Sequence, residues 1–238
     1  MKFSLLNQTH GKALLGMVAL ALSLSVGFGR TEAAPITLFS TGVDGSNNAL
    51  PAGSVDPHYV LTSSDDPAWP IPDAHVVGTP PATWVPNNTT PGASAQWIAP
   101  NPVQVGDVAA PGNAAGSYVY EVTFDLGPNP SQESISGEWA ASTYGLLFLN
   151  GVYVGNSTNL NGPTQLTPFS VPSTANFVSG VNKLDFVVVN AAQGATGLYV
   201  GAISGSYTPG IPEPSSVVLA GLGIAGMLVY RWRRGRTK

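Results

Sequence analysis

The strongest constraint on the fold is a clear period of two in the apolar side chains along residues 117–126. The apolar face of this segment consists of Tyr118, Tyr120, Val122, Phe124 and Leu126. The opposite face carries Glu121, Thr123 and Asp125. Because successive side chains of a β-strand point to opposite faces, this period of two predicts a strand with one buried face.

Shorter apolar runs recur along the chain and are separated by turn-forming residues. We expect further strands within residues 36–39, 59–61, 76–77, 135–139, 146–149, 152–154, 183–190 and 198–207. Asn150-Gly151 between two such runs predicts a tight hairpin, because both turn positions need positive φ. The chain also has 28 glycines and 21 prolines. The sequence therefore predicts an all-β fold, an antiparallel β-sandwich of about nine or ten short strands.

The N-terminus predicts export. Lys2 and Lys12 precede an apolar run, residues 13–26, that has the length of a signal-peptide core. Small side chains at Thr31 and Ala33 predict cleavage after Ala33, so residues 1–33 form a signal peptide with its helix. An uncleaved membrane anchor is the alternative. Residues 35–210 then form the ectodomain.

A second apolar segment, residues 217–230, lies near the C-terminus. It is shorter than the ~20 residues of a full membrane span, but flanking residues can extend it to the interface. A basic cluster follows it and consists of Arg231, Arg233, Arg234, Arg236 and Lys238. Basic residues beside a membrane helix stay cytoplasmic, so the sequence predicts a C-terminal transmembrane helix with the ectodomain outside the inner membrane.

The triplet Pro212-Glu213-Pro214 stands just before this segment. With the Gly-rich apolar helix and the Arg-rich end, it makes residues 211–238 resemble the PEP-CTERM sorting tail. The resemblance implies recognition by an exosortase, a membrane-embedded processing enzyme. It also implies cleavage near the motif and passage to the surface or matrix of a Gram-negative, exopolysaccharide-making cell. The two prolines keep the stem non-helical, so an enzyme could read it as an extended peptide.

Charge and cysteine content exclude several classes of function. Between Pro35 and Pro214 the single base is Lys183, against twelve acids. A basic nucleic-acid footprint is missing, so the sequence predicts no nucleic-acid partner. The acids are scattered, which is typical of a solvated surface. The chain has no cysteine, which excludes disulfides and thiolate metal sites.

Residues 36–207 resemble a galactose-binding-like jelly roll. The resemblance is carried by residues 135–141, 148–151, 177–190 and 196–200. It implies a jelly-roll ectodomain. Many members of that family bind carbohydrate at loops on one end of the sandwich, and some hold a structural Ca²⁺.

The ectodomain lacks the motifs of a catalytic site. It has two histidines, His58 and His75, and no Gly-x-Ser-x-Gly elbow, so we expect a protein that is not an enzyme. Asp65 and Asp66 are adjacent and would point apart on a strand, which makes them a poor glycosidase pair. They are interpreted as part of a solvated loop.

Hard cations bind carboxylate and amide oxygens, which makes Ca²⁺ the metal to consider. The candidate ligands are Asp44, Asn47 and Asp56, around a glycine-containing loop. The alternative is an Asx-rich turn without any ion, because Asn and Asp favour turns on their own account.

Trp69 and Trp84 lie in Pro-rich loops, where an exposed indole could stack on a sugar ring. The alternative for both is packing beneath a long loop. Trp97 and Trp139 lie in strand-like runs and are expected in the core. The sequence thus predicts a non-catalytic surface or matrix protein that binds a neutral extracellular polysaccharide, because one lysine cannot neutralise a polyanion. A structural or adhesive protein that engages other proteins is the alternative.

Overall fold

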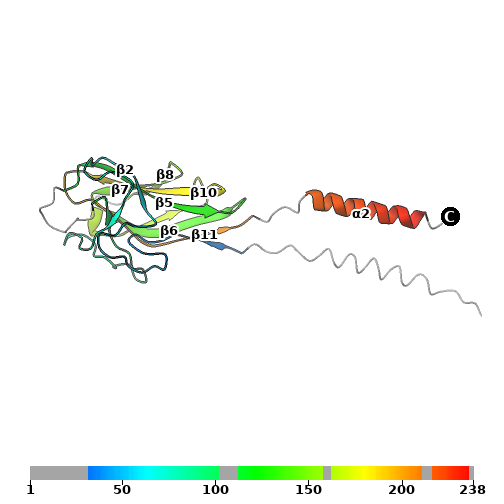
Figure 1. Ribbon diagram of the computed structural model, residues 1–238, viewed down its shortest axis with the longest axis horizontal. Helices are drawn as coiled ribbons and strands as arrows, with labels where there is room; N and C mark the ends of the chain where they lie inside the picture. Colours follow the sequence, from blue (N-terminus) through cyan, green and yellow to red (C-terminus); the bar gives the residue numbers. More distant parts are fainter. Residues whose placement is uncertain (1–31, 102–111, 158–161, 211–215, 236–238) are drawn as a thin grey trace, which may run out of the picture. The chain divides into compact units, whose positions relative to one another are not determined.

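The computed structural model describes residues 32–101, 112–157, 162–210 and 216–235 (Figure 1). In these residues, eleven strands form two antiparallel sheets. The first sheet has the order β3 (His75–Val76), β4 (Ile98–Ala99), β11 (Leu198–Thr208), β6 (Ser131–Ala141), β9 (Thr167–Val171), with β1 (Ala34–Ile36) also on β11. The second has the order β2 (Val60–Ser64), β5 (Gly116–Leu126), β10 (Gly180–Asn190), β7 (Tyr144–Leu149), β8 (Val152–Ser157). A 3-10 turn, η1 (Gly162–Thr164), and a helix, α2 (Ser216–Arg234), complete the described elements.

The main hydrophobic core lies between the two sheets, as the alternation predicted. The apolar face of β5 is buried along its whole length, from Tyr118 to Leu126. Trp139 on β6 packs edge-on against Phe186 of β10 at 5.3 Å between ring centroids, so the core joins one sheet to the other. The prediction of an antiparallel sandwich is confirmed.

The hairpin between β7 and β8 is also confirmed. Asn150 and Gly151 have φ of 50° and 77°, the positive values that a two-residue hairpin turn needs. The Asn150 side chain then stabilises the turn, because its Oδ1 accepts the N–H of Lys183 at 2.9 Å.

Two of these strands, β4 and β9, are missing from the sequence-based prediction. β9 contains Pro168, which cannot donate a ladder hydrogen bond and so weakens the strand pattern. The structure accommodates the proline because β9 is the edge of its sheet and pairs with β6 alone.

Several predictions for the two ends of the chain fall outside the described residues. These are the signal segment up to residue 31, the triplet Pro212, Glu213 and Pro214, and the terminal Arg236 and Lys238. The C-terminal apolar segment is helical, as α2, with Arg231, Arg233 and Arg234 in its last turn. Within the described parts of the chain, no helix has both the length and the apolarity needed to cross a membrane.

Candidate functional site

A structured loop follows β2 and presents Trp69. Asp66 is buried, and its Oδ1 accepts the N–H of Ala68 at 2.9 Å. The Trp69 N–H donates to the Asp66 carbonyl at 3.2 Å, and the Ser64 hydroxyl donates to the Trp69 carbonyl at 2.9 Å. These short-range bonds form an Asx-type turn, so the backbone that carries the indole is fixed locally.

The same carboxylate ties this loop to a segment far away in the sequence. Asp66 Oδ2 accepts the N–H of Ala114 at 2.9 Å and the Asn113 amide at 3.3 Å. The backbone carbonyl of Asn113 in turn accepts the N–H of Gly194 at 3.0 Å. A Cβ on Gly112 would lie 2.6 Å from the Gly194 Cα, so glycine is required for this close approach. Three segments therefore meet at one place.

A cavity of about 500 Å³ lies where they meet. Its walls are Asp66, Pro67, Ala68, Trp69, Gly112, Ala114, Ala115 and Gln193, which we call the Trp69 cavity. Trp69 is half-buried, so part of its indole remains open to a ligand. Gln193 is exposed, and its Nε2 donates to the Gly112 carbonyl at 3.4 Å, which leaves the amide further donor and acceptor capacity for a ligand. The Asp66 carboxylate, in contrast, already accepts three N–H groups. An aromatic wall beside a polar amide suits the apolar face and hydroxyl edge of a sugar ring.

Asp66→Ala is expected to destabilise the protein by about 2–4 kcal/mol, because it leaves the buried Asn113 amide and two partly buried backbone N–H groups without an acceptor. Asp66→Asn keeps one acceptor oxygen and should cost less. Chemical denaturation of the two variants measures both values. As a control, Asp73→Ala replaces an exposed aspartate and should stay within about 0.5 kcal/mol of wild type. If Asp66→Ala matches this control, Asp66 does not position the loop.

Trp84 does not share the environment of Trp69. It is only 9% exposed, and its ring lies 4.4 Å from that of Trp97. The Trp97 Nε1–H donates to the Val85 carbonyl at 2.7 Å, which holds the loop around Trp84 against the core. The interpretation of Trp84 as an exposed stacking residue is thereby corrected: it packs under its loop. Trp97 and Trp139 are core residues, as predicted.

The first calcium candidate, Asp44, caps a turn. Its Oδ1 accepts the N–H of Ser46 at 2.8 Å and of Asn48 at 2.9 Å. Hydrogen bonds from Asn48, and then from Ser46, lower the pKa of this carboxyl. Asn47 lies within the turn at a φ of 62°. All three features belong to an Asx turn.

The second candidate, Asp56, is buried and accepts backbone N–H groups. Its Oδ2 accepts Gly42 at 2.6 Å, and its Oδ1 accepts His58 at 2.8 Å and Tyr59 at 3.0 Å. Burial raises the pKa of Asp56, although these bonds oppose the rise. In the described segments, no group of three or more His, Cys, Asp or Glu side chains lies together so that it could hold a metal ion. Both Asp44 and Asp56 hold loops through the backbone N–H groups that they accept.

The ectodomain histidines make other contacts. The His58 ring stacks on Phe39 at 3.8 Å with an interplanar angle of 6°. His75 Nδ1 lies 3.3 Å from the Gly53 carbonyl oxygen. Asp56 bonds the backbone of His58 rather than its ring, so the sequence neighbours Asp56 and His58 do not form the orienting pair of a catalytic triad.

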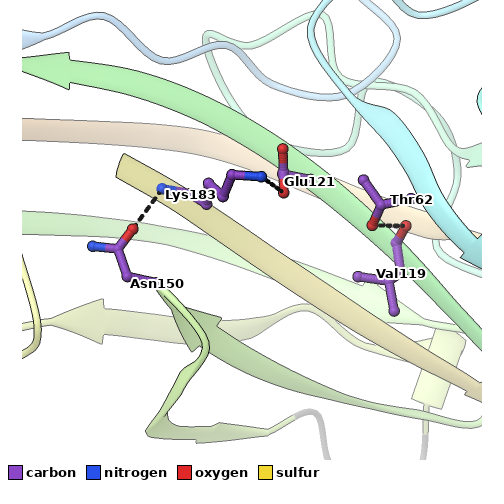
Figure 2. Close-up of polar contacts among 5 residues, drawn as sticks. All are labelled: Thr62, Val119, Glu121, Asn150 and Lys183. Carbon is purple, nitrogen blue, oxygen red and sulfur yellow. Dashed lines mark hydrogen bonds and ion pairs between the residues drawn. The ribbon is translucent and has the colours of Figure 1, made fainter. Parts of the chain in front are cut away.

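Lys183, the one base of the ectodomain sequence, is engaged in an ion pair (Figure 2). Its Nζ lies 2.9 Å from Glu121 Oε2, and this contact raises the pKa of Lys183. Figure 2 also shows Asn150 holding the Lys183 backbone, and the Thr62 hydroxyl donating to the Val119 carbonyl. The lysine lies on the sheet surface, not among the residues that line the Trp69 cavity.

Comparison with known proteins identifies the tail. Residues 210–234 match the PEP-CTERM protein-sorting motif. This confirms the tail predicted from the Pro-Glu-Pro triplet and the Arg-rich end, and it indicates an exported protein that is processed to the cell surface. No curated protein matches the chain.

The solved structures that this chain resembles are similar to it only at low sequence identity and low TM-score. An apo-form cyclase from Fischerella sp. is 11% identical, with 77% of this chain and 100% of that chain covered at a TM-score of 0.43. A CBM35 module of Cellvibrio japonicus Abf62 is 13% identical, with 76% and 100% covered and a TM-score of 0.31. An arabinose-bound α-L-arabinofuranosidase is 14% identical, with 76% and 31% covered and a TM-score of 0.36. TM-scores this low carry no conclusion about the ligand or reaction of this chain.

Proposed function

We propose that this chain is a non-catalytic surface or matrix protein whose sandwich binds neutral extracellular polysaccharide at the Trp69 cavity. The observation that carries the proposal is the half-buried indole of Trp69, which lines a cavity of about 500 Å³. Asp66 positions the loop that carries this indole through its hydrogen bonds to Ala68 and Ala114. Sugar rings bind through their apolar faces to aromatic side chains and through their hydroxyls to amides such as that of Gln193.

The charge of the ectodomain favours a neutral ligand. Its single lysine is paired with Glu121, and the remaining charged side chains of the segment are acids. A polyanion would be repelled at low salt, because charges interact over about 10 Å or more under those conditions. Titration with dextran and galactomannan, beside the polyanion alginate, tests this. Binding confined to alginate would contradict the proposal.

We further propose that α2 holds the precursor at the inner membrane until an exosortase-type enzyme cuts the tail. Apolar side chains on α2 are strongly exposed, at 59% for Leu222, 66% for Met227 and 64% for Leu228. Exposed apolar side chains such as these are stabilised by an apolar environment. The arginines in its last turn suit the cytoplasmic interface.

Trp69→Ala is expected to weaken polysaccharide binding by about 1–3 kcal/mol, roughly 5- to 150-fold in Kd, because the main apolar contact is removed. Isothermal calorimetry measures the affinity, and a melting curve measures stability. Tyr153→Ala is the matched control, because Tyr153 is an aromatic residue 48% exposed and does not line the Trp69 cavity. Calcium removal should leave affinity unchanged, since the Asp66 carboxylate that lines the cavity already accepts three N–H groups.

Two results would contradict this assignment. In the first, Trp69→Ala and Tyr153→Ala weaken binding equally, which places the ligand elsewhere. In the second, Trp69→Ala lowers the free energy of unfolding by the full amount, about 3–5 kcal/mol, that deleting a buried tryptophan costs, which makes the indole a core residue.

A protein-engaging adhesive function is the second candidate. It is favoured by β8, an edge strand whose Val152 and Tyr153 are 51% and 48% exposed. Edge strands with apolar side chains can pair with other chains. Concentration-dependent self-association of the protein that is lost in Tyr153→Lys would support this alternative.

A further inference from the structure

The strand register fixes which loops lie at which end of the sandwich. β5 and β10 pair along their full length, from Gly116↔Asn190 at one end to Leu126↔Gly180 at the other. β5 has 11 residues. At about 3.4 Å per residue, the two ends of this pair are roughly 34 Å apart.

The Trp69 cavity belongs to the end at which β5 begins. Ser64, the last residue of β2, pairs with Tyr118 near the start of β5. The Asp65 N–H continues this contact by donating to the Ser117 carbonyl at 3.3 Å. The other walls, Ala114 and Gln193, come just before β5 and just after β10. We call this the cavity end.

Both chain junctions of the ectodomain belong to the opposite end. Ala34, the first residue of β1, pairs with Tyr207 near the end of β11. The Tyr207 hydroxyl accepts the N–H of Gly127, the residue after β5, at 3.3 Å. The Gly210 N–H donates to the Pro128 carbonyl at 3.3 Å, just before the tail begins. In Figure 1, β1 and the end of β11 lie at the same end of the sandwich. We call this the tail end.

We infer that the Trp69 cavity lies at the end of the sandwich opposite the junction with the tail, so that the ectodomain holds a polysaccharide both before and after the tail is processed. The inference rests on the proposed function, and it adds that processing does not regulate binding. An enzyme or membrane bound to the tail approaches the tail end, roughly 34 Å from the ligand, and therefore does not compete for the cavity.

The full chain offers a direct test, because it has no cysteine and a single introduced thiol can be coupled to beads without ambiguity. Ala192→Cys places the bead at the cavity end, next to Gln193. Ser173→Cys places it at the tail end, just after β9. Both side chains are exposed, so neither substitution should disturb folding. Wild type and both variants are first titrated in free solution with galactomannan and dextran.

We expect the beads coupled at residue 173 to bind these polysaccharides as the free protein does. The beads coupled at residue 192 should bind at least about tenfold more weakly, because the support blocks the cavity. Equal binding by both beads, or the reverse order, would overturn the orientation while Trp69→Ala still reports on the site itself. Absence of binding by free wild type would overturn the proposed function, and the inference with it.

Discussion

Trp84→Ala is expected to lower the free energy of unfolding by about 3–5 kcal/mol, the usual cost of deleting a buried tryptophan. The side chain is 9% exposed and belongs to the second hydrophobic cluster of the ectodomain, beside Trp97 and Tyr199. Its ring contact with Trp97 at 4.4 Å adds about 0.5–1.5 kcal/mol to the simple loss of buried area.

Urea unfolding followed by circular dichroism measures this loss, with Trp69→Ala as the matched control. Both substitutions remove the same side chain from a Pro-rich loop, so any difference reports on burial. The control should lose less than half as much stability, because part of its indole is already exposed to water. Equal losses of stability would show that the two tryptophans are buried to the same extent, which would contradict the half-buried position of Trp69.

This pair also shows why the sequence could not separate the two residues. Trp84 and Trp69 have similar neighbours in the chain, so the sequence predicts the same environment for both. Their difference arises from distant contacts. Trp84 packs on Trp97, and Trp97 lies 5.7 Å from Tyr199, which comes from β11. Local patterns do not reveal such contacts.

The strands were easier to predict, because their signal is local. The period of two along β5 and the Asn150-Gly151 turn are properties of adjacent residues, and both were confirmed. β9 was missed because Pro168 interrupts a short pattern, which only its edge position makes tolerable. Whether such a short segment forms a strand depends on pairing partners that are distant in the sequence.

Asp66 was likewise misjudged as part of a solvated loop. An Asp-Pro pair after a strand is a turn signal, and the Asx turn to Ala68 could have been expected from it. The hydrogen bonds from Asn113 and Ala114 to Asp66 could not be expected from the sequence, since they span 47 and 48 residues. These distant bonds are what bury the carboxylate and bring the walls of the cavity together.

Replacing Pro212-Glu213-Pro214 with three alanines is expected to abolish release of the mature protein from the membrane fraction. The triplet lies within the matched motif, residues 210–234, and directly precedes α2, which begins at Ser216. Proline prevents helix continuation, whereas alanine is the best helix former. Three alanines would let the helix extend toward Gly210, so the processing enzyme would meet a helix in place of an extended peptide.

Cell fractionation with immunoblotting measures the released fraction at mature size. The control replaces Pro172-Ser173-Thr174, an exposed proline-containing triplet at the surface of the sandwich, and should be released normally. Glu213→Gln separates the two contributions of the motif, because it keeps both prolines and removes only the charge. Release of Glu213→Gln at the wild-type level would assign recognition to backbone shape alone. Normal release of the triple-alanine variant would show that the tail is not processed through this motif.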